Sequence, residues 1–364
     1  MRKEFERMAK EFAGRLPKTG YKVNRTLPQE GMNMNQIVKR LEQFEEIELK
    51  IKLPGKYSGC VFSTDEDLMQ LNKDAAKFFA FSDLSHPNMH VFAKQLENEI
   101  ISMLLNLFKG NSNCSGITTT GGSESIQLAI LAHKLHYRRK KGITKPEVII
   151  CETAHAAFYK ACDFWDIKLK VIPITKNFEV DMAAMESAIT PNTVLMVSSC
   201  PNYPYGTPDP LKPMADLALK HDFGLHMDCC MGGFLVPFVK DHGVDLEEDA
   251  YDFTVKGLTS ISTDPHKYGL TAKGISCLLF GDKEIQKSLY FCKADGPGPV
   301  YSTATVADAR GAAVMAACWA TMMYYGYNGY SKLAKFIYDS SKRLNDRINA
   351  LGDVKVVHYP VVSL

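Results

Sequence analysis

Between about His90 and Asp295 the sequence alternates short apolar runs with helical patterns. The apolar runs have the length of strands, and segments 182–189 and 211–221 between them have helical periodicity. Strands that alternate with helices form a mostly parallel sheet with helices on both faces, because each parallel crossover needs a helix-sized connection. The sequence therefore predicts an α/β fold with strands at 147–151, 169–175, 193–199, 223–228, 260–264 and 275–280.

A His-Lys pair lies in a turn between the last two of these predicted strands, in the sequence Asp-Pro-His266-Lys267-Tyr-Gly. A buried lysine is costly unless it is neutralised, paired or used covalently. One covalent use is a Schiff base with pyridoxal phosphate (PLP), for which desolvation is expected to lower the pKa of the amine. The alternative is a lysine in a surface loop whose amine reaches water.

A glycine-rich turn, Gly121-Gly122-Ser123, precedes a helical pattern that runs from Glu124 to about Lys141. The two glycines would let the backbone approach an anion closely, and Ser123 can donate from its N–H and its hydroxyl. The positive end of the helix points at the same place. The turn therefore predicts a phosphate-binding cup, with an N-capped helix after a glycine turn as the alternative.

Two further polar residues follow predicted strands. Asp228 ends the strand 223–228, and ligands of open α/β sheets lie beyond the carboxyl ends of strands. A carboxylate there could keep the pyridine nitrogen of PLP protonated, or it could cap the following turn. His155 follows the strand 147–151 and could stack on the pyridine ring, or it could be an ordinary residue at the start of a helix.

The order of these segments resembles the sphingosine-1-phosphate lyase family, which belongs to the PLP-dependent group II decarboxylases of fold type I. The resemblance runs from about Pro28 to the C-terminus and is most specific in segments 120–125, 154–158, 226–234, 256–274 and 316–323. It implies a PLP-dependent carbon–carbon lyase that cleaves a phosphorylated sphingoid base into a long-chain aldehyde and phosphoethanolamine. An amino-acid decarboxylase of the same fold and an inactive scaffold or regulatory paralogue stay open as alternatives.

The resemblance also implies roles for individual residues. Lys267 would carry the cofactor, Asp228 would be the pyridinium partner, and His155 would stack on the ring. His86 would lie near the substrate, and Thr303 would reach the cofactor phosphate of the other subunit in a homodimer. The implied cofactor-binding residues are Gly122, Ser123, His155, Asp228, His266, Lys267 and Thr303. No metal site is expected.

The resemblance implies that the chain has three parts, and several residues depart from the family pattern. We expect an N-terminal helical arm over 1–85, a large PLP-binding domain over 86–299, and over 300–364 an interface helix with the start of an incomplete small domain. The apolar run 354–364 would be the first strand of that small domain. Asp83-Leu84 stands where the family has Asn-Pro, which puts a carboxylate near an expected anion. The Gly-Pro-Gly-Pro sequence at 296–299 and Cys229 also depart from the family pattern.

Composition restricts partners and location. With 43 basic and 41 acidic residues the charge is nearly balanced, so no nucleic-acid partner is expected. Ten cysteines without metal-ligand spacing indicate reduced thiols, and the charged N-terminus does not read as a secretory signal. The uncharged stretch 311–331 begins with small residues, which favours a packed or interface helix over a membrane span. A cytoplasmic location is expected, with association with the endoplasmic reticulum membrane in the intact protein left open.

Overall fold

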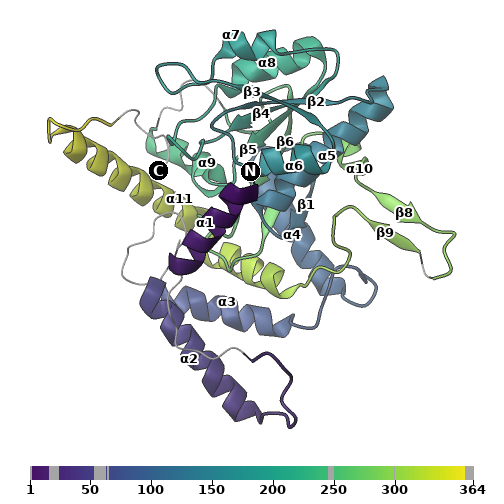
Figure 1. Ribbon diagram of the computed structural model, residues 1–364, viewed down its shortest axis with the longest axis vertical. Helices are drawn as coiled ribbons and strands as arrows, with labels where there is room; N and C mark the ends of the chain where they lie inside the picture. The colour runs from purple at the N-terminus through teal and green to yellow at the C-terminus, as the bar shows by residue number, and fades with distance from the viewer. Residues whose placement is uncertain are drawn as a thin grey trace. The chain divides into compact units, whose positions relative to one another are not determined.

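The computed structural model describes residues 2–15, 24–52, 63, 65–244, 250–298 and 300–356 (Figure 1). It divides into two compact units, Met1–Thr64 and Asp65–Leu364. The first unit contains the helices α1 (Arg2–Arg15) and α2 (Met34–Lys52), in agreement with the helical character expected for this segment. The domain boundaries expected at residues 85 and 299 stay predictions.

Within the described residues of the second unit, seven strands form one sheet in the order β1-β7-β6-β5-β4-β2-β3. Only β7 runs antiparallel to its neighbours, β1 and β6, so the other six strands point the same way. The mostly parallel α/β sheet is thereby confirmed. The strands are β1 (Ser115–Thr119), β2 (Glu147–Cys151), β3 (Lys168–Ile172), β4 (Thr193–Ser199), β5 (Gly224–Asp228), β6 (Leu258–Thr263) and β7 (Ser276–Phe280).

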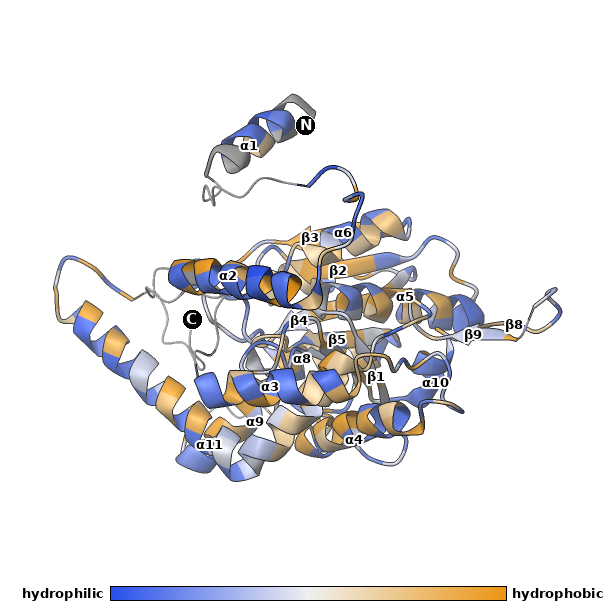
Figure 2. Cartoon of the chain, turned by 90° about the horizontal axis from the view of Figure 1, so that it is seen from below, coloured by the Kyte–Doolittle hydropathy of each residue, from blue (hydrophilic) through white to orange (hydrophobic). Residues whose placement is uncertain are grey.

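Burial explains why the strands read as apolar runs. Every residue of β2, β4, β5 and β7 is buried, as expected for sheet strands covered on both faces. Strand β1 was not predicted, because its two threonines and its glycine give it no continuous apolar run. Figure 2 shows the hydrophobic character of β2 and the hydrophilic outer end of α5 (Gly122–Lys141).

Helices between the strands pack against this sheet. Helix α5 packs across β4, β5, β6 and β7, and α8 packs against β4 and β5. The bounds of the helices that precede α11 are α3 (Glu66–Phe78), α4 (Val91–Leu107), α6 (Ala157–Phe164), α7 (Met182–Ser187), α8 (Leu211–His221), α9 (Val236–Val239) and α10 (Lys283–Lys287), with short 3₁₀ turns at Gly232–Phe234 and Lys240–His242.

The uncharged stretch expected to form a packed helix opens α11 (Ala313–Asn349), which bends at Gly326. This helix packs against α3, α4 and α9. Asn72 of α3 donates to the Thr321 hydroxyl of α11 at 3.0 Å, which ties the two helices together. None of the helices described for the chain is both long and apolar enough to cross a membrane. The cytoplasmic location stays a prediction.

A two-stranded hairpin, β8 (Phe291–Lys293) with β9 (Tyr301–Thr303), projects from the second unit in both views (Figures 1 and 2). Pro299, in its connecting loop, lies outside the described residues, so the expected shape of the segment 296–299 is not described in full. Most of the strand predicted over 354–364 also lies outside them, and residues 354–356 form no strand.

A buried ion cluster fixes β1 against α4 and the entry to α11. Glu97 is 3% exposed and accepts from Arg310 Nη1 at 2.9 Å, Lys94 Nζ at 2.6 Å and the Thr118 hydroxyl at 2.7 Å. Burial alone would raise the pKa of Glu97, but the charges of Arg310 and Lys94 lower it to about 2. Because this carboxyl titrates below its ordinary value, its contribution to stability is present above about pH 4.5 and is lost as the pH falls towards 2.

We expect Glu97→Gln to lower the free energy of unfolding by about 3–5 kcal/mol at pH 7, because Arg310 would keep a buried charge with no counter-charge. Urea unfolding measures this, and the difference from wild type should shrink between pH 4.5 and pH 2. Glu186→Gln is the matched control, since its pair with Lys220 lies at the surface, where solvent screens ion pairs, and its loss should change stability little. Equal losses in the two variants would contradict a special role for the buried cluster.

Candidate active site

The site residues predicted from the sequence lie at or just after the ends of strands that run in the same direction. Gly122 comes after β1, His155 after β2, and Lys267 after β6, while Asp228 ends β5. Because six strands are parallel, these positions lie at one edge of the sheet, beyond the carboxyl ends of the strands. Ligands of open α/β sheets bind at this edge.

Lys267 lies in the turn after β6 and is paired with Asp264. Its backbone N–H donates to the Asp264 carbonyl at 3.0 Å, and its Nζ lies 3.0 Å from Asp264 Oδ2. The Asp264 side chain is 2% exposed and that of Lys267 is 23% exposed, so the pair is largely shielded from water. Helix α11 stabilises this turn, because the Tyr330 hydroxyl donates to the Gly269 carbonyl at 3.0 Å.

The expected lowering of the Lys267 pKa is wrong for the chain without cofactor. Burial does push the pKa of this amine down, but nearby negative charge outweighs burial and raises the pKa above its ordinary value. The carboxylates of Asp264 and Asp228 supply that charge. The nearby Cys230 thiol does not, because burial raises its pKa and keeps it protonated. Lys267 is therefore an ammonium ion in this state.

The glycine turn before α5 lies directly against the Lys267 pair. A Cβ atom placed on Gly122 would come within 2.7 Å of Asp264 Oδ2 and 3.0 Å of Cys230 Sγ. A Cβ on Gly121 would lie 3.6 Å from the His266 ring. Any side chain at Gly122 would thus displace the Asp264 carboxylate, which explains the need for glycine. Ser123 follows on the exposed side of the first helical turn.

His266 turns its ring toward the same cluster. Its Nδ1 accepts from the Ile275 N–H at 3.2 Å, so in the neutral ring the proton sits on Nε2. Nε2 lies 3.5 Å from Asp264 Oδ2. Burial lowers the pKa of His266 against the opposing effect of Asp264, which keeps the imidazole neutral near pH 7. The ring can therefore present one N–H donor to the cluster.

Asp228 is held by a chain of polar side chains that crosses from β5 to β6. Its Oδ1 accepts from the Cys230 N–H at 3.1 Å and from the Ser262 hydroxyl at 3.3 Å. Ser262 in turn lies 3.2 Å from His226 Nε2, and His226 Nδ1 lies 2.9 Å from the Ser260 hydroxyl. Burial lowers the pKa of His226 to about 3, so the ring is neutral and passes hydrogen bonds without adding charge. This chain fixes the orientation of the Asp228 carboxylate.

A second buried carboxyl, Asp209, lies after β4, the strand next to β5. Its Oδ2 accepts from the Ser199 N–H at 2.7 Å, and its side chain is 3% exposed. Burial raises the pKa of Asp209 to about 7, the Ser199 N–H opposes this, and the charge of Asp228 adds to the rise. Asp228 thus has a neighbour that is only partly ionised at neutral pH.

The two glycines after Asp228 allow its segment to pack flat on the neighbouring elements. A Cβ on Gly233 would lie 1.8 Å from the Thr263 hydroxyl oxygen, and a Cβ on Gly232 would lie 2.3 Å from the Cys200 carbonyl oxygen. No side chain fits at either distance. Larger residues would move this segment, and with it the position of Asp228 relative to β6.

Three predicted site residues are not joined to the cluster by the interactions described for the chain. His155 is exposed before α6, and its Nδ1 accepts from the Ala157 N–H at 3.1 Å. His86 is exposed before α4. Thr303 ends β9, and its hydroxyl lies 3.1 Å from that of Thr305. Their predicted roles in stacking, substrate binding and cross-subunit contact stay predictions.

The carboxylate at Asp83, a departure from the resembled family, is satisfied within its own turn. Its Oδ1 accepts from the Ser85 N–H at 2.7 Å and from the Ser85 hydroxyl at 2.5 Å. These bonds lower the pKa of Asp83, so the carboxyl is ionised rather than protonated. The surrounding backbone pairs with the segment before α11, because the Leu84 N–H donates to Arg310 and the Ala312 N–H to Ser82.

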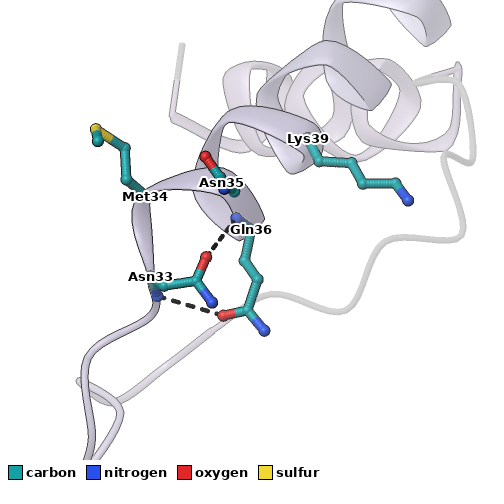
Figure 3. Close-up of a pocket in the computed structure, with 5 residues that line it drawn as sticks. All are labelled: Asn33, Met34, Asn35, Gln36 and Lys39. Atoms are coloured by element: carbon teal, nitrogen blue, oxygen red, sulfur yellow. Dashed lines mark hydrogen bonds between the residues drawn. The ribbon is translucent and has the colours of Figure 1, made fainter.

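A surface hollow at the start of α2 belongs to the first unit and has a different character (Figure 3). Asn33 Oδ1 accepts from the Gln36 N–H at 2.9 Å, and Gln36 Oε1 accepts from the Asn33 N–H at 3.3 Å. This reciprocal pair is a capping box that satisfies the first N–H groups of the helix. This capping box explains the start of α2, and of the residues that line the hollow Lys39 alone is titratable.

The sequence reasoning missed four residues that shape the site: Asp209, His226, Ser262 and Asp264. Ser260 and Ser262 lie on either side of Ile261 in a strand whose last four residues are all buried, and such polar positions need partners. That pattern could have pointed to the chain from Ser260 to Asp228. Asp264 stands three residues before Lys267, a spacing that lets two side chains of one turn meet.

Residues 71–364 match the family model described as the pyridoxal-dependent decarboxylase conserved domain. The chain belongs to the pyridoxal-dependent decarboxylase family. Pyridoxal phosphate is the cofactor that this family implies, and the cluster fits it. A largely shielded lysine, a carboxylate at the end of β5 and a glycine-lined helix N-terminus could supply an amine, a partner for a ring nitrogen and donors for a phosphate.

Curated relatives of this decarboxylase-family chain include sphingosine-1-phosphate lyase 1 of Rattus norvegicus, 36% identical over 340 residues, and sphingosine-1-phosphate lyase of Saccharomyces cerevisiae, 32% identical over 342 residues. Both matches cover 93% of this chain but only 59% and 58% of the relatives, so the chain spans about three fifths of their length. The resemblance stated from the sequence is confirmed.

Solved structures agree with this family assignment. The sphingosine-1-phosphate lyase of Burkholderia pseudomallei K96243 is 30% identical and has a TM-score of 0.86. The superposition covers 90% of this chain and 76% of that one. A glutamate decarboxylase of Lactobacillus brevis has a TM-score of 0.76 at 18% identity and covers 94% of this chain and 79% of its own. The second similarity shows the shared fold alone.

Proposed function

We propose that this chain is a PLP-dependent lyase that cleaves the C2–C3 bond of a phosphorylated sphingoid base, giving a long-chain aldehyde and phosphoethanolamine. The observation that carries the proposal is the cluster of Lys267, Asp264, Asp228 and Gly122 at one edge of the sheet. The similarity to several sphingosine-1-phosphate lyases selects the substrate class.

Each residue of the cluster has a defined task in this proposal. The bound cofactor supplies an electron sink for the bond that breaks. Lys267 provides the amine that anchors the cofactor, and the Gly122 and Ser123 backbone at the positive end of α5 receives its phosphate. Asp228, held by Ser262 and the Cys230 N–H, keeps the ring nitrogen protonated. His155, by its place after β2, would cover one face of the ring.

A product assay tests the proposal and separates it from its alternatives. The purified chain, loaded with pyridoxal phosphate, is incubated with sphingosine phosphate, and aldehyde and phosphoethanolamine are measured by mass spectrometry. Parallel incubations with amino acids measure carbon dioxide. Equal amounts of aldehyde and phosphoethanolamine would support the lyase. Carbon dioxide alone would indicate a decarboxylase, and cofactor binding without any product would indicate a scaffold.

We further propose that the active unit is a homodimer in which Thr303 reaches the cofactor phosphate of the partner. The hairpin that carries Thr303 projects from its own unit (Figure 1). The Thr303 and Thr305 hydroxyls lie 3.1 Å apart. Two adjacent hydroxyls suit a dianion, which is held best when several donors converge on it.

Subunit complementation tests the dimer. Lys267→Ala and Thr303→Glu should each be inactive alone, the second because it places a carboxylate against the phosphate. After subunit exchange a mixed dimer holds one site with both residues intact, so about a quarter of the wild-type sites should recover. No recovery from subunits that do exchange, or a monomer that binds the cofactor tightly, would contradict the shared site.

A further inference from the structure

Lys267 lies in a tight loop that backbone hydrogen bonds close. The Leu270 N–H donates to the Lys267 carbonyl at 3.0 Å, and the Thr271 N–H donates to the Pro265 carbonyl at 3.3 Å. Leu270 has a φ of 61°, in the left-handed region that a leucine seldom adopts. Such a conformation persists only where the surrounding structure determines it. The loop that carries the amine therefore needs support from other elements.

The side chain of Asn72, on helix α3, supplies such support. Asn72 is buried, and its Oδ1 accepts from the Ala272 N–H at 2.9 Å and from the Thr271 hydroxyl at 3.1 Å. Its Nδ2 donates to the Leu68 carbonyl at 2.9 Å and to the Thr321 hydroxyl at 3.0 Å. The two donor and two acceptor positions of the amide are thus all used, which fixes its orientation.

Tyr330 supports the same loop from helix α11. Its buried hydroxyl donates to the Gly269 carbonyl at 3.0 Å. Because Thr321 also belongs to α11, Asn72 joins the loop to this helix as well as to α3. Residues 269–272 are therefore held by two helices, and they are themselves hydrogen-bonded to the segment that contains Lys267.

We propose that Asn72 is a positioning residue for Lys267, which holds the loop in the conformation that presents the lysine nitrogen to the aldehyde of the cofactor. In the attachment reaction the nitrogen bonds to the aldehyde carbon, and the carbonyl oxygen leaves as water. The rate depends on how the two atoms are held, and a misplacement of about 1 Å can lower it about a hundredfold. Asn72 acts through the loop and not by contact with the cofactor.

The competing role for Asn72 is a purely structural tie between α3 and α11, and two ligands separate the two roles. Pyridoxal phosphate must react with Lys267, whereas pyridoxamine phosphate carries an amine in place of the aldehyde and binds only noncovalently. Loss of lysine positioning should slow the reaction of the first and spare the binding of the second. General damage to the fold should impair both.

The test measures these two quantities in the full chain, without catalytic turnover. Samples mixed with pyridoxal phosphate are quenched with borohydride at increasing times, and mass spectrometry of the Lys267 peptide gives the rate of adduct formation. Titration gives the dissociation constant of pyridoxamine phosphate. We expect Asn72→Ala to form the adduct at least about tenfold more slowly and to keep its affinity for pyridoxamine phosphate within about twofold.

Single-hydroxyl variants make the test independent of whether Asn72→Ala folds. Thr271→Val removes the hydroxyl that Asn72 accepts and keeps the branched shape, whereas Thr271→Ser keeps the hydroxyl. Tyr330→Phe removes the bond to the Gly269 carbonyl. Thr271→Val and Tyr330→Phe should each slow adduct formation less than Asn72→Ala, and Thr271→Ser should react at the wild-type rate.

Gln70→Ala is the matched control for Asn72→Ala. Gln70 is an exposed amide of the same helix, and it donates to Asp74 at 3.0 Å. Its removal should leave both measurements unchanged. Urea unfolding of each variant checks that the chain is folded under the conditions of the test.

Adduct formation at the wild-type rate in Asn72→Ala and Thr271→Val would overturn the inference, and so would an equal loss of pyridoxamine phosphate binding. The inference rests on the proposed role of Lys267 and not on the lyase reaction. A wild-type chain that forms no adduct on Lys267 would refute the proposed cofactor site and the inference with it. A failed product assay with normal adduct formation would refute only the substrate assignment.

Discussion

Lys267→Ala is expected to abolish covalent attachment of pyridoxal phosphate and to reduce lyase turnover by several orders of magnitude. The side chain supplies the amine just after β6, in contact with Asp264. Dialysis followed by absorbance spectroscopy measures retained cofactor, and the product assay measures turnover. Because the variant leaves the buried Asp264 carboxylate without its ammonium partner, its folding is checked by circular dichroism before the cofactor is added.

Lys287→Ala is the control for this substitution. Lys287 is an exposed lysine of α10 that pairs with Glu284 at 2.6 Å, at the opposite edge of the sheet. Its removal should change neither cofactor retention nor turnover. A Lys267→Ala chain that keeps a borohydride-reducible cofactor adduct would show that another amine carries the cofactor.

Asp228→Asn is expected to leave the cofactor bound but to lower turnover by orders of magnitude. Asparagine can still accept from the Cys230 N–H and the Ser262 hydroxyl through its side-chain oxygen, so the local structure should persist. A neutral amide cannot hold the ring nitrogen protonated, and the electron sink weakens. Turnover at saturating substrate and cofactor affinity by titration separate the two effects.

Ser262→Ala provides a graded comparison for Asp228. It removes one hydrogen bond to the carboxylate and breaks the link to His226, but it leaves the charge in place. We expect a much smaller loss of turnover than in Asp228→Asn. If Asp228→Asn kept wild-type turnover, Asp228 would only cap the turn that follows β5.

The sequence predicted the fold well where burial leaves a continuous apolar run. Strands β2, β4 and β7 were found close to their bounds because every residue in them is buried. Strand β1 was missed because its two threonines and its glycine leave no continuous apolar run. The threonine hydroxyls are satisfied by Glu97 and Ser125. The antiparallel direction of β7 was likewise not predicted, because strand direction depends on the path of the chain through space.

The sequence placed Lys267, Gly122 and Asp228 at the ends of strands that meet at one edge of the sheet, while the roles of these residues stay predictions. They could be named because each lies at or just after the end of a strand, in a recognisable order along the chain. The pKa of Lys267 was predicted in the wrong direction, since burial was visible in the sequence and the contact with Asp264 was not. The chain from Ser260 through His226 to Asp228 joins residues more than 30 positions apart, a register that only the β5–β6 pairing fixes.

Peptide mapping after borohydride reduction shows which lysine carries the cofactor. The chain is loaded with pyridoxal phosphate, reduced and digested, and each lysine-containing peptide is searched by mass spectrometry for the mass of the reduced cofactor. The account predicts one modified residue, Lys267, with stoichiometric occupancy and with competition by inorganic phosphate. Modification of a different lysine, or cofactor that binds without modifying any lysine, would contradict it.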